Sequence, residues 1–305
     1  MKGVFIDASD GLAEVYRKVS RPSDPWVTVY EEERVPQEAL PRLLLGEDFV
    51  IVDHTKLPTA AMESCPGLRH VIFLGTGAKS YMSPEELRGI GIRVHIIKGY
   101  GDVAVAEHAI ALMAAGARGL ARMDRGIREG RWPRTEGLEL AGKTIGVIGF
   151  GGIGAEVARI ARGIGMRVLA WNRTPKVAPG VAFVALDRLL SESDVVSLHL
   201  LLDEETKGFL DAERLKKLKP KAILVNTARG ALVDEEALVA ALAEGRLRHA
   251  ALDVFASEPL PPGHPLTLLD TVTLSAHSGF RTPEASERLV RSGLDIACRL
   301  ASEAS

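Results

Sequence analysis

Cysteine and long apolar runs are scarce in this 305-residue chain, and each scarcity excludes a class of protein. The two cysteines, Cys65 and Cys298, stand far apart and in no metal-binding spacing, so we expect two buried thiols, no metal and a reducing compartment. No stretch approaches the ~20 apolar residues of a membrane span. The first residues turn polar too early for the apolar core of a signal peptide. We therefore expect a cytoplasmic protein.

A strong charge of either sign is also missing. The formal net charge is -2, while 26% of the residues are charged and 46% are hydrophobic, which is the balance of a soluble globular protein. Without a strong electrostatic field, we expect neither nucleic acid nor a membrane as a partner. The length fits two domains better than one.

Short apolar runs alternate with helical patterns along the first third of the chain, which is typical of a parallel sheet covered by helices. The helix at residue 83 has the clearest start, because Ser83 can cap it and Pro84 occupies its first position. We expect strands at residues 3–7, 26–29, 49–52, 70–74 and 92–96, and helices at 36–45, 58–63 and 83–88.

A long alanine-rich helix is predicted from residue 103 to about residue 129, and a second alternating series follows it. Gly116 and Gly119 suit close packing of this helix against another element, with a second subunit as one candidate. The second series predicts strands at residues 144–149, 167–171, 194–200, 222–226, 249–253 and 272–275, and helices at 153–164, 212–218 and 235–243. Six strands in such a series complete one doubly wound α/β domain.

The helix expected at residues 283–300 has no strand after it, so we infer that it returns to the first domain. This predicts one domain from residues 1–98 and 281–305. The second domain, residues 99–280, is then an insertion in the first.

A glycine-rich loop, Gly149-Phe150-Gly151-Gly152-Ile153-Gly154, lies between a predicted strand and a predicted helix and matches G-x-G-x-x-G. Gly149 allows the tight turn, Gly151 lets the backbone approach a pyrophosphate, and Gly154 lets the helix pack closely on the strand. The anion would lie on the unpaired N–H groups at the helix start, beside Gly152 and Ile153. The alternative is a structural turn without a ligand.

The residue that reads the cofactor ribose is expected at the end of the next strand, where the sequence is Asn172-Arg173-Thr174. An acid here would accept hydrogen bonds from the 2′-hydroxyl of NAD, but none is present. Arg173 can instead pair with a 2′-phosphate, with Asn172 and Thr174 as donors, at about 1.5–3 kcal/mol for a charge-assisted bond. We therefore favour NADP(H). The alternative is that Arg173 faces solvent and that NAD also binds.

Three segments with polar side chains stand at predicted strand ends, residues 225–230, 252–259 and 274–279. Arg229 can grip a carboxylate with two parallel hydrogen bonds. His277 can give a proton to a forming alkoxide, and Glu258 can orient the imidazole and favour its charged form. Taken singly, each residue has a structural interpretation. Their joint arrival at successive strand ends favours reduction of a 2-keto acid.

The sequence resembles the D-2-isomer-specific 2-hydroxyacid dehydrogenases, which include glyoxylate/hydroxypyruvate reductases, D-lactate dehydrogenases and phosphoglycerate dehydrogenases. The motifs that carry the resemblance are Val105-Ala106-Glu107-His108, the glycine-rich loop, Asn226-Thr227-Ala228-Arg229-Gly230, Asp253-Val254-Phe255 with Glu258-Pro259, and His277 with Gly279. The resemblance implies a Rossmann cofactor domain inserted in a flavodoxin-like substrate domain. It also implies that Arg229, Glu258 and His277 are catalytic.

Further site residues follow from the same resemblance. It implies that Asp253 contacts the nicotinamide carboxamide, and that the backbone of the loop Gly75-Thr76-Gly77-Ala78 holds the substrate carboxylate. Tyr100 is expected near the substrate. The remaining cofactor contacts that it implies are Val105, His199, Thr206 and Thr227.

The sequence departs from the family pattern at several positions. Lys79 replaces an acid, Leu201 replaces a proline, and Ala276 and Ser278 flank His277 where other residues are usual. His54, Lys56 and Lys79 either recognise a second anionic group or are ordinary surface charge. For His108 and Glu107 we expect a structural role, and Glu258 argues against formate dehydrogenase, which should carry Gln there.

Together these features predict a homodimeric enzyme that transfers hydride between NADPH and a small 2-keto acid, with glyoxylate or hydroxypyruvate favoured. One alternative is a phosphoglycerate or D-lactate dehydrogenase that uses NAD. The other is a dinucleotide-sensing, corepressor-like protein without catalysis, which the presence of Arg229, Glu258 and His277 disfavours.

Overall fold

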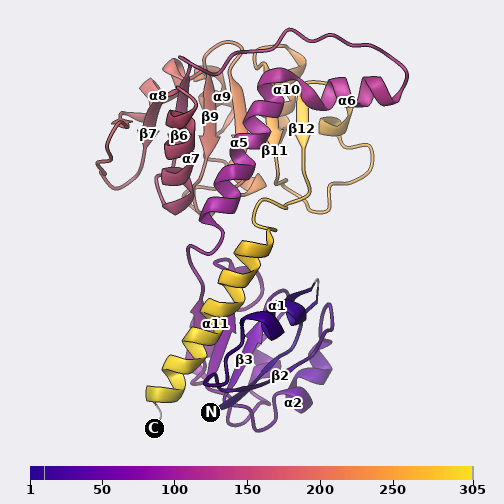
Figure 1. Ribbon diagram of the computed structural model, residues 1–305, viewed down its shortest axis with the longest axis vertical. Coiled ribbons are helices and arrows are strands. Elements are labelled where there is room, and N and C mark those ends of the chain that lie inside the picture. The colour runs from indigo at the N-terminus through magenta and orange to yellow at the C-terminus, as the bar shows by residue number, and fades with distance from the viewer. Residues whose placement is uncertain (10, 304–305) are drawn as a thin grey trace. The chain divides into compact units, whose positions relative to one another are not determined.

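The computed structural model describes residues 1–9 and 11–303, and the chain divides into two compact units (Figure 1). Unit 1 consists of Met1–Gly101 and Arg281–Ser305, and unit 2 of Asp102–Phe280. All strand pairs among the described residues of both units are parallel, as is typical of an α/β fold. Among the described residues, no helix taken singly is long and apolar enough to cross a membrane.

Unit 1 is built on a sheet whose described strands run in the order β2-β1-β3-β4-β5, the flavodoxin-like order. Its central strand β3 is buried throughout, and a Cβ atom on Gly3 of β1 would lie 2.5 Å from the Phe49 ring of β3. The Phe49 ring therefore leaves no room for a residue larger than glycine at position 3. The strands are β1 Lys2–Phe5, β2 Trp26–Val29, β3 Phe49–Val52, β4 His70–Phe73 and β5 Arg93–Ile96.

The helices of unit 1 are short except for the last one. They are α1 Leu12–Val19, α2 Leu40–Leu43, α3 Thr59–Met62, α4 Pro84–Gly89 and α11 Pro283–Glu303, with single 3-10 turns η1 Gln37–Ala39 and η2 Ala78–Ser80. Leu289, Val290 and Leu294 of α11 are buried in one core cluster with residues of β1, β3 and β4. An ion pair fixes the same helix, because Arg291 Nη1 and Nη2 lie 2.7 and 2.8 Å from the two carboxylate oxygens of Asp24.

Unit 2 contains a sheet with the order β12-β11-β10-β9-β6-β7-β8, in which the direction of winding reverses between β6 and β9. This is the doubly wound Rossmann order with one further strand, so the predicted fold class is confirmed. The strands are β6 Thr144–Ile148, β7 Arg167–Trp171, β8 Ala182–Phe183, β9 Val195–Leu198, β10 Ile223–Asn226, β11 His249–Leu252 and β12 Val272–Leu274.

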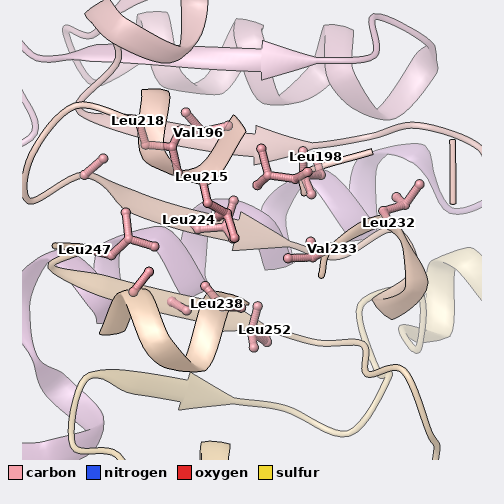
Figure 2. Close-up of a cluster of buried hydrophobic side chains, with 14 of the residues drawn as sticks. Val196, Leu198, Leu215, Leu218, Leu224, Leu232, Val233, Leu238, Leu247 and Leu252 are labelled. Carbon is pink, nitrogen blue, oxygen red and sulfur yellow. The ribbon is translucent and has the colours of Figure 1, made fainter. Parts of the chain in front are cut away.

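Helices cover both faces of this sheet, and each face has its own buried cluster. One face packs on α5 Asp102–Arg118 and α7 Gly152–Gly163. The other packs on α8 Leu186–Glu192, α9 Ala212–Lys217 and α10 Glu235–Ala243. Leucine and valine side chains fill this second layer between sheet and helices (Figure 2). The short turns η3 Gly230–Leu232 and η4 Pro265–Leu268 complete unit 2.

Several expected elements differ from the structure. The single helix predicted at 103–129 is two helices, α5 and α6 Leu120–Arg128, because Gly119 between them adopts φ 64°. Gly116 and Gly119 face His249 and Thr135 of the same unit, where added Cβ atoms would lie 2.7 and 2.8 Å away. The helix predicted at 36–45 contains only η1 and α2.

Other differences are omissions. Helices α1 and α8 and the two-residue strand β8 were not predicted, so the series has seven strands and not six. Cys65 is a buried free thiol as expected, whereas the prediction of burial was wrong for Cys298, which is only half-buried beside Asp24.

The Arg291–Asp24 ion pair is expected to be a stability element of unit 1. Their side chains are only 14% and 4% exposed, so we expect Asp24→Asn to lower the free energy of unfolding by about 3 kcal/mol in urea denaturation. Glu31→Gln is the matched control, because it breaks the exposed pair with Arg17 and should cost under about 1 kcal/mol. Equal losses in the two variants would contradict a special role of Asp24.

The same pair predicts an acid limit of stability. The hydrogen bonds from Arg291 lower the pKa of Asp24 from 3.8 to about 2. Because the folded-state pKa is the lower one, the stabilisation is present above pH 3.8 and is lost as the pH falls through about 2.

Candidate active site

The candidate site of unit 2 lies at the carboxyl ends of its parallel strands. The glycine-rich loop follows β6, and Asn172 follows β7. The polar segments after β10, β11 and β12 are the three singled out in the sequence. Because carboxyl ends of parallel strands meet at one edge of a sheet, the topology gathers these segments there, beside the point where the winding reverses.

The buried carboxylate of Asp253 organises the segment that carries His277. Its Oδ1 accepts hydrogen bonds from Ser275 Oγ at 2.6 Å and from the Ser278 amide at 3.0 Å. Its Oδ2 accepts from the Gly279 amide at 2.9 Å. Burial raises the pKa of Asp253, but the hydrogen bonds outweigh it and hold this pKa at about 2. Asp253 is therefore a permanent anion whose donors come from its own chain.

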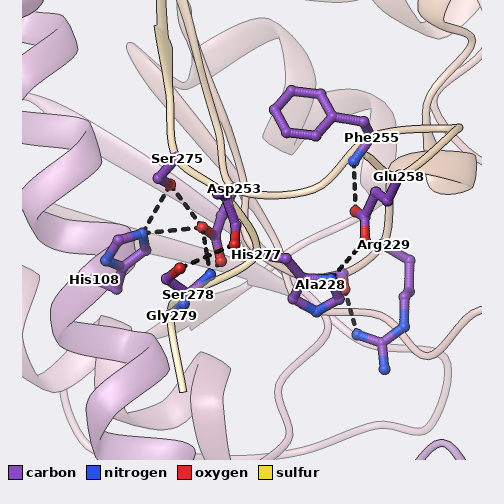
Figure 3. A network of polar contacts seen from close by, with 11 residues as sticks. His108, Ala228, Arg229, Asp253, Phe255, Glu258, Ser275, His277, Ser278 and Gly279 are labelled. Carbon is purple, nitrogen blue, oxygen red and sulfur yellow. Dashed lines mark hydrogen bonds and ion pairs between the residues drawn. The ribbon is translucent and has the colours of Figure 1, made fainter. Parts of the chain in front are cut away.

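His108 of α5 completes this network (Figure 3). Its Nε2 lies 2.9 Å from Ser275 Oγ and 3.2 Å from Asp253 Oδ1. These contacts connect α5 to the ends of β11 and β12, which agrees with the structural role that we expected for His108. The family resemblance implied that Asp253 contacts nicotinamide, and the structure adds these internal bonds.

His277 and Glu258 form a hydrogen-bonded pair beside this network. His277 Nδ1 lies 2.7 Å from Glu258 Oε2, and Glu258 Oε1 accepts from the Phe255 amide at 2.9 Å. Burial raises the pKa of Glu258, but the bonds to His277 and Phe255 and the charge of Arg229 lower it below its ordinary value. The carboxylate is thus ionised and can favour a protonated imidazole.

The backbone at His277 is held in an unusual conformation. Its φ is 47°, in the left-handed region that non-glycine residues rarely adopt. The His277 amide donates to the Asp253 carbonyl at 2.8 Å, and the next two amides donate to the Asp253 carboxylate. These three bonds keep the ring directed toward Glu258.

Arg229 is carried by a loop that packs directly on the β11 loop. A Cβ atom on Gly230 would lie 1.9 Å from the carbonyl carbon of Phe255, so only glycine permits this approach. Asn226 fixes the loop from inside, since its Nδ2 donates to the Arg229 carbonyl at 2.9 Å. The Arg229 side chain is exposed, with Nη1 donating to the Ala228 carbonyl at 2.6 Å. Gly230 packs against Phe255, whose amide bonds to Glu258, so the loop that carries Arg229 lies beside the His277–Glu258 pair.

The glycine-rich loop has the shape that a dinucleotide needs. Gly149 has φ 92°, and a Cβ atom there would lie 2.5 Å from the His199 carbonyl oxygen. At Gly154 a Cβ atom would lie 2.1 Å from the Gly149 carbonyl oxygen. Open space surrounds Gly151, the residue that caps α7, so its backbone can be approached. The amides of Gly152 and Ile153 lie in the first turn of α7, where amides have no acceptor within the helix, and they suit a pyrophosphate.

Two buried polar atoms near the strand ends also fit a ligand. His199 Nδ1 and Thr227 Oγ1 have no hydrogen-bond partner among the described residues. Buried polar groups are normally satisfied, so these atoms suit a cofactor group as partner. Burial lowers the pKa of His199 to about 4, and its Nε2 lies 2.8 Å from Ser197 Oγ. The ring is therefore neutral at pH 7.

The segment after β7 is pinned to the glycine loop. Asn172 Oδ1 accepts from the Phe150 amide at 2.9 Å, and Asn172 Nδ2 donates to the Thr174 carbonyl at 2.8 Å. Lys176 Nζ donates to the Phe150 carbonyl at 2.6 Å. The exposed Arg173 between them forms an ion pair with Glu205, at 2.7 Å.

The remaining predicted cofactor residues lie at the edges of this arrangement. Val105 is half-buried on α5, whose first residue, Asp102, occupies the space that a side chain at Gly152 would need. The Thr206 hydroxyl donates to the Leu201 carbonyl at 2.7 Å and so holds the loop after β9.

The predicted substrate residues of unit 1 follow β4 and β5. Thr76 is exposed and Gly77 half-buried in the loop after β4, and the Tyr100 carbonyl accepts from Arg288 Nε at 2.8 Å. His54 Nδ1 lies 2.5 Å from Asp53 Oδ2, and Lys79 pairs with Glu85 at 3.1 Å. Lys56 is exposed. Recognition of a second anionic group by these side chains stays a prediction.

Sequence reasoning assigned no role to three residues that the structure brings into the site. Ser275 bridges His108 and Asp253, Lys176 supports the glycine loop, and Glu205 pairs with Arg173. Only the run Asp203-Glu204-Glu205, shortly after β9, could have signalled an acidic partner. Within residues 1–9 and 11–303, no group of three or more His, Cys, Asp or Glu side chains could hold a metal ion.

A dinucleotide loop at the switch point of a parallel sheet, with an imidazole–carboxylate pair at neighbouring strand ends, defines a nicotinamide-dependent oxidoreductase. Residues 110–279 match the family model described as D-isomer specific 2-hydroxyacid dehydrogenase, NAD binding domain. The chain belongs to the D-isomer-specific 2-hydroxyacid dehydrogenase family, as the resemblance implied, and these enzymes act on CH–OH groups with a nicotinamide cofactor.

Individual relatives support the assignment. A glyoxylate reductase of Thermofilum pendens is 38% identical over 277 residues, which cover 86% of this chain and 81% of that protein. A hydroxypyruvate reductase of Thermotoga maritima is 36% identical, with 84% and 86% covered. The crystal structure of the TT0316 protein from Thermus thermophilus gives a TM-score of 0.87 at 34% identity, covering 99% of this chain and 97% of that one.

The close packing of the glycine-rich loop at Gly154 predicts how one added methyl group changes dinucleotide binding. We expect Gly154→Ala to weaken NADH binding at least about tenfold in a fluorescence titration, because the new Cβ would displace the Gly149 carbonyl and with it the loop. Gly163→Ala on the same helix is the control, since nothing lies within 4 Å of its Cβ position. Unchanged NADH affinity in a folded Gly154→Ala protein would show that the loop does not bind the dinucleotide.

Proposed function

We propose that this enzyme reduces glyoxylate or hydroxypyruvate to the corresponding hydroxy acid with NADPH. The observation that carries the proposal is the 2.7 Å contact between His277 and Glu258, with the loop of Arg229 packed against Phe255, whose amide bonds to the same carboxylate. Several relatives with high similarity are named as glyoxylate or hydroxypyruvate reductases, which favours these substrates over others of the family.

Each side chain has a distinct task in this proposal. The bound nicotinamide supplies the hydride. The exposed guanidinium of Arg229 anchors the substrate carboxylate in a planar, two-pronged geometry. His277 Nδ1 is engaged by Glu258, so Nε2 is the nitrogen that gives a proton to the alkoxide oxygen. Glu258 holds the ring and offsets its positive charge.

The cofactor part of the proposal depends on Arg173. No acid directly follows β7, and Arg173 is exposed beside the glycine loop, where it can meet a 2′-phosphate. Asn172 and Thr174 are proposed to assist it, and Gly149, Gly151, Gly152, Ile153 and Gly154 to hold the pyrophosphate. In unit 1, Thr76, Gly77 and Tyr100 are proposed to contact the keto acid.

We also propose a cytoplasmic homodimer. Leu120, Ile127 and Trp132, on and just after α6, are 51%, 54% and 75% exposed, which suits burial against a second copy. The free thiols of Cys65 and Cys298 suit a reducing compartment.

A panel of keto acids tests the function directly. Glyoxylate, hydroxypyruvate, pyruvate and phosphohydroxypyruvate would each be assayed with NADPH and with NADH by the loss of reduced-cofactor absorbance. We expect the highest kcat/KM for glyoxylate or hydroxypyruvate with NADPH, and a loss of about 10²–10⁴-fold in kcat for His277→Ala.

Other results of this panel would select the alternatives. Preference for pyruvate or phosphohydroxypyruvate with NADH would indicate a D-lactate or phosphoglycerate dehydrogenase. Cofactor binding without turnover of any keto acid would indicate a dinucleotide sensor.

The Glu258 carboxylate predicts a change in pH dependence. Because the pKa of Glu258 lies below its ordinary value, this group stays ionised at neutral pH and favours the protonated imidazole that reduction requires. In Glu258→Gln, the neutral amide cannot stabilise a charged ring, so we expect the reductive kcat to decline at a lower pH than in the wild type. A pH profile of kcat at saturating substrate measures this, and an unshifted profile would show that Glu258 only positions the ring.

A further inference from the structure

We propose that Glu205 sets the balance between NADPH and NADH, because its carboxylate competes with the cofactor 2′-phosphate for the guanidinium of Arg173. This inference rests on the proposed function, in which Arg173 reads the 2′ position. Arg173 Nη1 lies 2.7 Å from Glu205 Oε2, although 32 residues separate them in the sequence. Their side chains are 74% and 75% exposed, so the pair is open to an incoming anion.

The backbone of Arg173 has little freedom to leave this position. Asn172 before it and Lys176 after it bond to the amide and to the carbonyl of Phe150, inside the glycine-rich loop. A dinucleotide whose pyrophosphate occupies that loop therefore brings its adenosine ribose toward the same segment. The side chain of Arg173 is 74% exposed, and the contact with Glu205 orients its guanidinium.

The backbone of Glu205 is equally constrained. The loop after β9 is closed by Thr206 Oγ1, which donates to the Leu201 carbonyl at 2.7 Å. Asp203 Oδ1 accepts from the amides of Glu205 and Thr206 at 3.0 and 2.9 Å. Two constrained loops, one after β7 and one after β9, thus present opposite charges to each other.

This geometry has opposite consequences for the two cofactors. The end of β7 lacks the acid that would accept hydrogen bonds from a 2′-hydroxyl, and Glu205 supplies a carboxylate beside the Arg173 guanidinium from another loop. A 2′-phosphate must either displace Glu205 from Arg173 or share the guanidinium with it, and in both cases it stands beside a like charge. Because exposed ion pairs are weak, the phosphate can displace it, but at reduced affinity.

Replacement of Glu205 tests the proposal without removing Arg173. We expect Glu205→Gln to strengthen NADPH binding about fivefold or more, and to leave NADH binding unchanged or weaker, in fluorescence titrations at one fixed salt concentration. The matched control is Glu204→Gln, an adjacent exposed acid for which the structure records no contact with Arg173. It removes the same charge from the same loop, so it should leave the ratio of the two dissociation constants unchanged.

A second background separates pairing from general electrostatics. In Arg173→Gln, the further change Glu205→Gln should no longer alter the ratio of the NADPH and NADH dissociation constants. The guanidinium for which Glu205 and the phosphate compete is then absent. An equal effect of Glu205→Gln with and without Arg173, an equal effect of Glu204→Gln, or no effect of Glu205→Gln would each overturn the inference.

The outcomes also distinguish this inference from the proposed function. If the wild type prefers NADH, the proposed use of NADPH fails, while Glu205 is still judged by the difference between variants. If the wild type prefers NADPH and Glu205→Gln leaves the ratio unchanged, the proposed function stands and the inference about Glu205 falls.

Discussion

The carboxylate of Asp253 receives its hydrogen bonds from the segment that carries His277, and the rest of the site depends on this interaction. Ser275 Oγ and the amides of Ser278 and Gly279 converge on its two oxygens. A buried anion without such donors would be strongly unfavourable, so the segment cannot turn away without exposing the charge to an apolar interior. The same constraint holds His277 at φ 47° and leads its ring to Glu258. An electrostatic requirement in the core thereby fixes the position of His277, the proposed proton donor.

Close approach of backbones completes the site, and glycine makes it possible. Gly149 passes within reach of the His199 carbonyl, and Gly230 lies against the backbone of Phe255. Each contact joins loops from two different strands, β6 with β9 and β10 with β11. A larger residue at Gly149 would move the dinucleotide-binding loop away from the loop after β9. A larger residue at Gly230 would move the loop that carries Arg229 away from the loop after β11. The geometry of the site therefore requires glycine at both positions.

Sequence patterns predicted the parts of this arrangement that are local. Buried apolar runs located the strands, and the polar residues directly after them included Arg229, Asp253 and His277. Helices α1 and α8 escaped prediction because their N-cap residues, Gly11 and Ala185, offer no side chain that caps the first turn. The bond between His108 and Ser275 joins residues 167 positions apart, and no spacing in the sequence signals such a pair. The same holds for Arg173 and Glu205, so the charge of Arg173 was foreseen but its partner was not.

The distribution of charge explains how a protein with a net charge of -2 can suit two anionic ligands. Asp253 faces inward, and hydrogen-bond donors of its own chain stabilise its charge. Arg229 and Arg173 face outward, and each keeps guanidinium donors beyond its one recorded contact. The strand ends thus present cations to solvent while their central anion is buried. Local orientation, and not overall charge, would then give this edge of the sheet the proposed affinity for a carboxylate near His277 and for phosphate near the glycine loop.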